Sequence, residues 1–393
     1  MSPALATQSE LAELAELFQL RKDVAFLNHG SYGACPRPVF ETYQSWQREI
    51  EREPVDFLGR RVARLLAEAR AALAEYVGTS ADNVVFGPNL TWGMNAIAKS
   101  LWLKPGEEVL ATNLEYGAVD RTWRFYCDKR DVRYINQPIT VPVTTAETFV
   151  EELWAGVTDR TRIIMISHIT SGTALIFPVA EVCRRARAAG IITVIDGAHA
   201  TSQIDLRLDE LGADFYVGNC HKWLCAPKGS AFLFARPERQ ELLEPLIISW
   251  GWQADRPSKS LFIDHFERQG TSDPSAYLTV PAAITFQRQH DWSRVRAACH
   301  ALARDARERI GALTGLPQLA PDSPDWWQQM CSIPLPAVEG QNLHDRLWTD
   351  FQIEIPAHLG PNGSRVRISI QAYNSQQDVD RLVEALTIIL SGK

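Results

Sequence analysis

One lysine, Lys222, follows the apolar run FYVGN and precedes a tryptophan, at a point where a buried strand is expected to end. A lysine in this position can be a surface residue at the end of a strand. Alternatively, burial lowers the pKa of the amine, which can then form a Schiff base with an aldehyde. The neighbouring histidine and tryptophan, and the glycine-containing loop after them, fit a pocket for that chemistry.

An aspartate, Asp196, follows another apolar run and has small residues beside it in VIDGAHA. A carboxylate here can keep a pyridine nitrogen protonated, which makes the ring an electron sink, and the small neighbours would let a planar ligand approach. The same aspartate could instead cap the segment that follows it. His199, three residues on, could contact a ring hydroxyl or could be a core histidine with satisfied hydrogen bonds.

A third stretch, GPNLTWGMN at residues 87–95, joins an expected strand to an expected helix. The backbone N–H groups of Leu90 and Thr91, with the Thr91 hydroxyl, would form an anion site suited to a phosphate. Simple capping by Asn89 or Thr91 explains this stretch equally well on its own. A phosphate cradle, a strand-end aspartate and a later strand-end lysine are together the requirements of pyridoxal 5'-phosphate. We therefore predict that cofactor.

Alternating strands and helices must position these residues. Residues 55–270 contain β-branched apolar runs separated by helical patterns, which predict an α/β domain with a doubly wound, mostly parallel sheet. In such sheets, ligands gather at the carboxyl ends of the strands. Residues 1–54 and 271–393 are expected to form a smaller α+β domain from both chain ends, with the terminal helix against a small sheet containing VRISI.

Composition and charge exclude several function classes. The net charge of -7 and the absence of a basic run give no electrostatic case for nucleic acid. Seven cysteines show neither CxxC pairing nor zinc-ligand spacing, so we expect a reducing cytoplasm and no metal. The acidic N-terminal stretch lacks the features of a signal peptide, and no stretch is long enough for a membrane span.

The whole chain resembles the class V branch of the fold-type I aminotransferase superfamily, particularly the isopenicillin N epimerase-like and cysteine desulfurase-like proteins. The resemblance is carried by FLNHGSYGACPRPV near the N-terminus and by two cofactor motifs, VIDGAHA and NCHKWLCAPKG. It implies a pyridoxal-phosphate-dependent homodimer with active sites at the subunit interface. Gly270 and Thr271 in ERQGTSD match a segment that in relatives touches the neighbouring subunit's phosphate, although their composition also fits a surface turn.

The resemblance also assigns roles around the cofactor. Lys222 would form the Schiff base and later move the proton at the substrate α-carbon. Asp196 would pair with the pyridinium nitrogen, and His199 would contact the ring oxygen. Tyr116, in NLEYGAV, is the candidate for stacking on the ring, with a core tyrosine as the alternative. The residues expected to reach the phosphate are Leu90, Thr91, Asn219 and His221.

Substrate binding is expected to involve an arginine near the C-terminus. Arg367, in SRVRISI, matches the residue that binds the substrate α-carboxylate in relatives, with a fork geometry that lysine could not copy. Arg365 would face the same side of a strand, so the choice between the two stays open. Asn28 and His29 are expected to form the far wall of the substrate pocket.

The cofactor does not fix the reaction, because epimerisation, β-elimination and transamination all start by removing the α-proton. A persulfide-forming desulfurase needs a cysteine shortly before the substrate arginine, where this chain reads FQIEIPAHLGPNGSRVR, and Cys331 lies too far upstream. We expect an epimerase acting on an α-amino acid, with a C–S β-lyase as the alternative and an aminotransferase or desulfurase less favoured. An epimerase also needs a second acid or base, for which Tyr116, His29 or a partner residue could serve.

Overall fold

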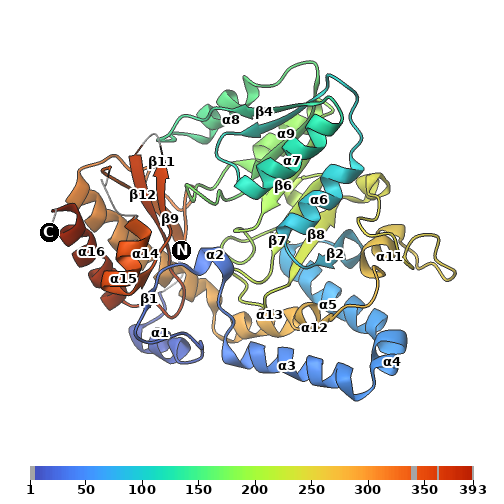
Figure 1. Ribbon diagram of the computed structural model, residues 1–393, viewed down its shortest axis with the longest axis horizontal. Coiled ribbons are helices and arrows are strands. Elements are labelled where there is room, and N and C mark those ends of the chain that lie inside the picture. The colour runs from blue at the N-terminus through green and yellow to red at the C-terminus, as the bar shows by residue number, and fades with distance from the viewer. Residues whose placement is uncertain (1–4, 338–342, 361–362, 392–393) are drawn as a thin grey trace.

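The computed structural model describes residues 5–337, 343–360 and 363–391. Its centre is a seven-stranded sheet in the order β2-β8-β7-β6-β5-β3-β4 (Figure 1). The pairs from β4 through β7 are parallel, whereas β8 pairs antiparallel with both β7 and β2. The strands are β2 Val84–Gly87, β3 Glu108–Thr112, β4 Arg133–Gln137, β5 Thr161–Ser167, β6 Ile192–Gly197, β7 Phe215–Asn219 and β8 Ala231–Ala235. The predicted mostly parallel α/β sheet is confirmed.

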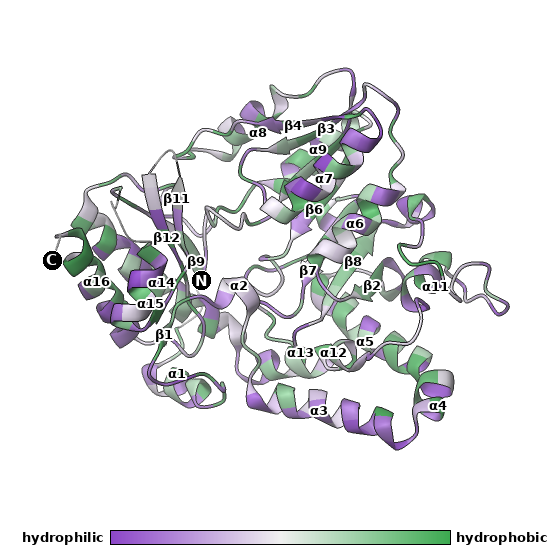
Figure 2. Ribbon diagram, viewed as in Figure 1, coloured by the Kyte–Doolittle hydropathy of each residue, from purple (hydrophilic) through white to green (hydrophobic). Residues whose placement is uncertain are grey.

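Both faces of this sheet are covered, which explains the continuous apolar runs in its strands. Successive side chains point to opposite faces, so Ile164 and Ile166 of β5 join one core cluster whereas Ile163 and Met165 join a second. Figure 2 shows the hydrophobic residues of the strands and of the inner helix faces. The helices that contribute to these clusters include α5 Val62–Val77, α6 Leu90–Ser100, α7 Gly117–Lys129, α8 Ala146–Trp154, α9 Val179–Ala188 and α11 Leu261–Glu267.

A smaller three-stranded antiparallel sheet lies beside the central one, in the order β11-β12-β9. Its strands are β9 Met330–Leu335, β11 Ala357–Gly360 and β12 Gly363–Ser369. The long helix α14 (Trp292–Thr314) packs against β9, and the terminal helix α16 (Gln376–Leu390) packs beside α14. The predicted small sheet containing VRISI is thereby confirmed, whereas the predicted division of the chain near residues 54 and 270 stays a prediction.

Segments from the N-terminal and the C-terminal parts of the chain pair in this part of the molecule. Strand β1 (Ala25–Phe26) pairs in parallel with β10 (Ile353–Glu354), so the N-terminal segment is bound to the C-terminal one. The chain then continues through α2 (His29–Tyr32) towards the central sheet. The remaining helices are α1 Gln8–Ala15, α3 Arg37–Arg52, α4 Pro54–Asp56, α10 Leu208–Leu211, α12 Ser275–Leu278, α13 Val280–Gln289 and α15 Leu343–Phe351, with a π-helix at Phe57–Arg61 and 3-10 helices at Ala81–Asn83 and Pro237–Leu242.

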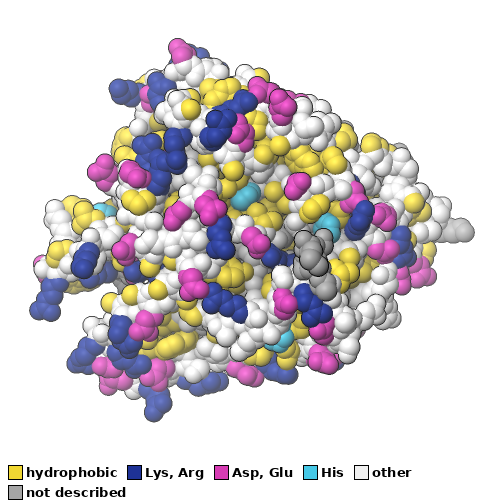
Figure 3. All heavy atoms as spheres, turned by 180° about the vertical axis from the view of Figure 1, so that it is seen from behind, with side chains coloured by type: hydrophobic (Ala, Val, Ile, Leu, Met, Phe, Trp, Pro, Cys, Tyr) yellow, Lys and Arg dark blue, Asp and Glu magenta, His cyan; other side chains and the backbone are white. Residues whose placement is uncertain are grey.

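The surface carries charges of both signs. On the face seen in Figure 3, acidic and basic side chains are interspersed with apolar and neutral ones. Within the described residues, no helix combines the length and the apolar character that crossing a bilayer requires.

Candidate active site

A cavity of about 360 Å³ lies at the carboxyl ends of β5, β6 and β7. Strand β4 lies on one side of β3 and β5 on the other, so successive crossovers diverge there and leave a crevice at the strand ends. The sequence-predicted residues that line this cavity are Leu90, Thr91, Tyr116, Asp196, His199, Asn219, His221 and Lys222. The structure therefore brings the three predicted motifs to one place.

The amine of Lys222 faces an imidazole whose proton can be assigned. The indole N–H of Trp223 lies 3.3 Å from Nδ1 of His199 and donates to it, so the neutral imidazole carries its proton on Nε2. That Nε2 lies 3.2 Å from Lys222 Nζ, to which it can donate only if the amine has a free lone pair. Burial lowers the pKa of His199 well below its ordinary value, which keeps the ring neutral.

The charge state of Lys222 agrees with this hydrogen bond. Burial, and next the nearby Arg367 guanidinium, lower the pKa of Lys222 to about 7, against the opposing influence of Asp196. A large part of the amine is therefore neutral at neutral pH. A neutral amine is the nucleophilic form that attacks a carbonyl carbon.

Asp196 is the second-last residue of β6, and its carboxylate is buried at the cavity wall. Asp196 is only 2% exposed, and its Oδ1 accepts a hydrogen bond from the backbone N–H of Ala198 at 2.9 Å. Burial raises the pKa of Asp196 to about 6, while the Ala198 N–H and the Lys222 charge oppose the rise. Within the described residues, no lysine or arginine forms an ion pair with this carboxylate, so it is suited to receive a cationic N–H group from the cavity.

The start of α6 forms the anion-binding end of the cavity. Asn89 caps the helix by accepting the N–H of Trp92 at 2.9 Å, and Oδ1 of Asn219 accepts the N–H of Leu90 at 3.0 Å. The Leu90 N–H is thus already used. Among the described residues, the Thr91 N–H, the Thr91 hydroxyl and the amide N–H₂ of Asn219 have no partner and remain for an anion. The positive end of the helix dipole adds to their attraction for a phosphate.

His221, the fourth residue expected at the phosphate, also lines this end of the cavity. Its Nδ1 lies 2.8 Å from the carbonyl oxygen of Ser230 and donates to it, so Nε2 is the free ring nitrogen. Burial, and next the Lys222 charge, lower the pKa of His221 to about 4. A bound dianion would oppose that shift and favour protonation of Nε2.

Arg367 on β12 is buried next to the cavity. Only 4% of the residue is exposed; Nη1 donates to the carbonyl oxygen of Ser171 at 2.7 Å, and Nη2 donates to Oγ of Ser31 at 3.1 Å. Its Nε has no hydrogen-bond partner in the described residues. Arg367 also lowers the pKa of Lys222, whereas Arg365 has no such influence. This geometry favours Arg367 in the choice that the sequence left open.

Comparison with known proteins agrees with this arrangement. The model of the family Aminotransferase class-V matches residues 36–382, which is most of the chain. The chain belongs to the class V aminotransferase family. The isopenicillin N epimerase of Amycolatopsis lactamdurans is 35% identical over 95% of this chain and 97% of its own. The putative L-cysteine desulfhydrase 1 of Oryza sativa subsp. japonica is 28% identical over 96% of this chain and 85% of its own.

Solved structures with the same fold include C-DES, a cystine C–S lyase. A C-DES variant with glycine covalently linked to its pyridoxal-phosphate cofactor superposes with a TM-score of 0.81, at 18% identity over 98% of this chain and 100% of that chain. This likeness confirms that the class V chain described here has the fold-type I architecture predicted from its sequence.

Two predicted substrate-wall residues of this class V chain lie behind the cavity wall. His29 is fully buried, with Nε2 donating to the carbonyl oxygen of Lys222 at 3.0 Å, and Asn28 donates to a carboxylate on β10 at 2.8 Å. Neither residue lines the cavity, whereas Ser31 and Tyr32 from the same segment do. His29 therefore supports the backbone of the lysine, and the wall is formed two or three residues further on.

Several residues that line the cavity had no prediction, among them Ser31, Tyr32, Ser167 and Ser171, and neither did Glu115, which precedes the lining residue Tyr116. Glu115 accepts the backbone N–H of Ser167 at 2.9 Å, the Ser167 hydroxyl at 2.6 Å and the Thr112 hydroxyl at 2.6 Å. Burial raises the pKa of Glu115 to about 8, and Asp196 adds to the rise. These bonds tie the loop of Tyr116 to β5. In the sequence, the feature that could have indicated Glu115 is its position as an acidic residue between the end of a strand and Tyr116, the candidate for stacking on the ring.

Gly270 and Thr271 lie outside the cavity. They belong to an exposed turn after α11 and do not line the pocket of their own chain. Nearby, Trp250 is 78% exposed and Trp252 is 48% exposed. The predicted contact of this turn with a neighbouring subunit stays a prediction.

Gly33→Ala is expected to lower the free energy of unfolding by about 3 kcal/mol, from left-handed backbone strain and overpacking together. Gly33 has φ +70°, and a Cβ here would lie 2.0 Å from the carbonyl oxygen of His221 and 3.0 Å from Cα of Lys222. Urea unfolding measures the change. Gly106→Ala is the matched control because Gly106 has φ +80° but open space around its Cβ, so that only strain of about 1 kcal/mol applies. Equal losses in both variants would contradict the close packing at Gly33.

Proposed function

We propose that this class V aminotransferase binds pyridoxal 5'-phosphate and epimerises an amino acid at its α-carbon. The observation that carries the proposal is that Lys222 and Asp196, from the ends of two neighbouring strands, line one cavity whose third side is the start of α6. The amine suits the cofactor's aldehyde, the buried carboxylate suits its ring nitrogen, and the helix start suits its phosphate. When bound, the cofactor supplies an electron sink that lowers the barrier to removal of the α-proton.

The chain's own residues then divide the work. The Lys222 amine would hold the cofactor through its aldehyde carbon and, when free, would take the α-proton. Asp196 would keep the ring nitrogen protonated, and the Nε2–H of His199, which faces the Lys222 amine in the cofactor-free protein, would donate to the ring oxygen. Arg367 receives the substrate α-carboxylate, since a guanidinium fork matches two carboxylate oxygens. Asn219, His221, Leu90 and Thr91 surround the phosphate.

Epimerisation also requires a proton donor on the face of the ring opposite the lysine. Tyr116 lines the cavity and is 45% exposed, so it can exchange protons with solvent. His29 lies behind the wall and is bonded to the lysine backbone, so it does not compete for this role. The relative named isopenicillin N epimerase supports this reaction, because it is 35% identical to this protein over 95% of this chain.

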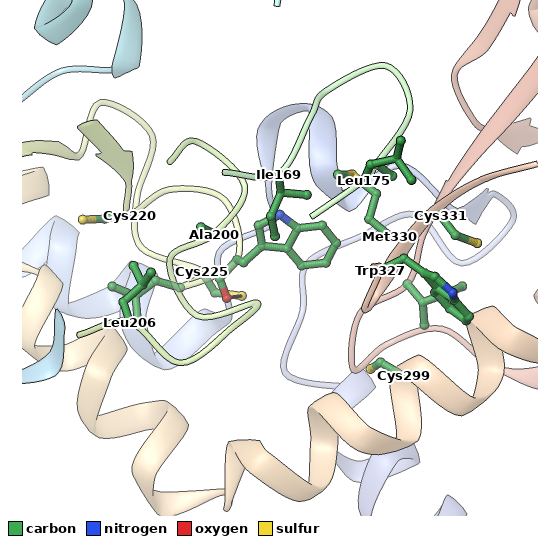
Figure 4. Close-up of a cluster of buried hydrophobic side chains, with 14 of the residues drawn as sticks. Ile169, Leu175, Ala200, Leu206, Cys220, Cys225, Cys299, Trp327, Met330 and Cys331 are labelled. Carbon is green, nitrogen blue, oxygen red and sulfur yellow. Dashed lines mark hydrogen bonds between the residues drawn. The ribbon is translucent and has the colours of Figure 1, made fainter. Parts of the chain in front are cut away.

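A C–S β-lyase is the second candidate, because relatives at 25–28% identity are named as L-cysteine desulfhydrases. Such an enzyme needs only the lysine and a substrate with a good leaving group. Transfer of sulfur through a protein persulfide is less favoured. Figure 4 shows Cys220, Cys225, Cys299 and Cys331 within a buried hydrophobic cluster, and burial raises the pKa of the Cys331 thiol to about 12. A buried thiol of this kind supplies little of the reactive thiolate.

The reaction can be assigned by incubating the cofactor-loaded enzyme with single amino acids in deuterated water. Exchange of the α-proton with inversion at the α-carbon and no other product supports the epimerase. Release of pyruvate and sulfide identifies the lyase, and a keto acid identifies an aminotransferase. Absence of exchange with every amino acid would overturn the proposal.

We further propose that the enzyme is a cytoplasmic homodimer whose Gly270 turn reaches the neighbouring subunit's phosphate. The exposed Trp250 and Trp252 beside this turn are the kind of large apolar side chains that subunit interfaces cover. Light scattering that gives a monomer mass for the loaded enzyme would contradict the dimer, and recovery outside the cytoplasmic fraction would contradict the location.

A further inference from the structure

Two arginines approach the cavity from β12. Arg365 and Arg367 are two residues apart and so project from the same face of the strand, roughly 6–7 Å apart along it. Arg367 donates to the carbonyl oxygen of Ser171, and Nε of Arg365 donates to the carbonyl oxygen of the next residue, Gly172, at 3.3 Å. Ser171 lines the cavity, so the half-buried Arg365 is bonded to the residue that follows this part of the cavity wall.

This arginine pair, Arg365 and Arg367, has no negative partner among the described residues. Neither guanidinium forms an ion pair with a carboxylate in the part of the chain that the structure describes, and both hydrogen bond to neutral oxygens. Arginines that serve only to hold a fold are more often paired with acids when they are withdrawn from water. Two partly desolvated positive charges beside one cavity therefore favour a ligand with two negative groups.

A third nitrogen group stands next to the pair. His358 on β11 lies opposite Arg365 in the strand register, and its Nε2 is buried without a hydrogen-bond partner. Burial, and next the charges of Arg365 and Arg367, lower the pKa of His358 to about 4, so the ring is neutral. Its unpaired nitrogen and the Nε of Arg367 both remain for a ligand.

We propose that the substrate carries a second acidic group, which Arg365 binds while Arg367 binds the α-carboxylate. This inference rests on the proposed function and adds a substrate class to it: α-amino acids whose side chain ends in a carboxylate or a similar oxyanion. The ends of an extended five- or six-carbon amino dicarboxylic acid are roughly 5–6 Å apart, which is close to the spacing of the two arginines. A neutral side chain would leave the Arg365 charge without a partner.

The test compares acidic with neutral substrates. Exchange of the α-proton is measured for L-glutamate and L-2-aminoadipate, and for the neutral L-glutamine and L-norleucine, in the wild type and in Arg365→Met. We expect kcat/KM for the acidic substrates to fall at least about tenfold in the variant, mainly through KM, because a charge-assisted bond is lost. The neutral substrates should change less than about twofold on the same reasoning. Arg365→Lys should recover part of the loss by restoring the charge.

A binding measurement keeps the test independent of turnover. Calorimetry of adipate with the loaded wild-type enzyme should give a dissociation constant that weakens at least about tenfold in Arg365→Met. Arg184→Met, at an exposed arginine on α9, is the control and should change neither value. Exchange that is equally fast with neutral substrates and unaffected by Arg365→Met would overturn this inference and leave the proposed function standing. Absence of exchange with all amino acids would instead contradict the proposed function, and adipate binding unaffected by the variant would contradict the second acidic site.

Discussion

Lys222→Ala is expected to lower α-proton exchange by at least about 10⁴-fold, because it removes both the covalent attachment of the cofactor and the base that takes the proton. Water would be a poor substitute for the amine as the base. The amine is positioned 3.2 Å from the His199 imidazole, and its pKa, lowered to about 7, leaves much of it free to accept a proton at neutral pH. No other lysine lines the cavity in the described residues. Loss of the Lys222 charge removes one influence that lowers the pKa of Asp196, so we expect the variant to fold with Asp196 more readily protonated.

Absorbance spectroscopy checks the same variant without turnover. Wild-type protein that has been stripped of cofactor should develop a visible band on addition of pyridoxal phosphate, and borohydride should abolish it. The rate of this loading should rise as the pH increases through about 7, because the free-base amine of Lys222 is the reacting form. Lys129→Ala, at an exposed position in the last turn of α7, is the control and should load like the wild type. A borohydride-sensitive band that survives in Lys222→Ala would contradict the assignment.

The fold and the cofactor end of the site could be predicted because both follow from local sequence patterns. Continuous apolar runs alternating with helical periods indicate a parallel sheet, and parallel strands place their carboxyl ends at one edge. Asp196 and Lys222 each follow such a run, so their convergence needs no knowledge of loop shape. The helix α8 (Ala146–Trp154) was not predicted, although its buried residues Phe149, Val150 and Leu153 lie at helical spacing.

The substrate end depended on contacts between distant segments. Arg365 and Arg367 share a strand face, and only the position of Ser171 and Gly172, almost 200 residues earlier in the chain, separates their environments. His29 was expected on the pocket wall, but the close packing of the N-terminal segment against the lysine loop turns it to the Lys222 backbone. A sequence pattern carries no information on such pairings, since neither segment's periodicity determines its distance from the other.

The raised pKa of Glu115 could not be predicted from the sequence either. Burial raises its pKa, while the hydrogen bonds that it accepts from Ser167, a residue 52 positions away on β5, oppose the rise. In the sequence it is one acidic residue in a loop, where solvent exposure is the usual state. Only the assembled crevice shows that two carboxyl groups, Glu115 and Asp196, lie close enough to influence one another.

Asp196→Asn is expected to lower kcat by about 10²–10⁴-fold, which corresponds to the loss of one member of a buried ion pair. The substitution changes little in the shape of the site. The carboxamide oxygen can still accept the Ala198 N–H that Oδ1 accepts at 2.9 Å. What it cannot do is carry the negative charge that keeps a ring nitrogen protonated, so the bound cofactor would withdraw electrons less strongly from the α-carbon.

The same substitution should stabilise the cofactor-free protein. Burial raises the pKa of Asp196 to about 6 from an ordinary 3.8, so the folded state binds this proton more tightly than the unfolded state. The favourable contribution of the protonated form is therefore complete below pH 3.8 and is lost as the pH rises through 6. Asparagine is neutral throughout, and its advantage in Tm over the wild type should grow between these two pH values.

Calorimetric Tm values of the cofactor-free proteins and kcat of the loaded proteins together test the role of Asp196. Asp159→Asn, at an exposed carboxylate outside the cavity, is the control and should alter neither quantity. A higher Tm with a lower kcat is expected only if the carboxylate is buried at a cost to the empty site and used by the loaded one. A variant that loses Tm as well as kcat would instead indicate that Asp196 supports the fold, and unchanged kcat would exclude it as the partner of the ring nitrogen.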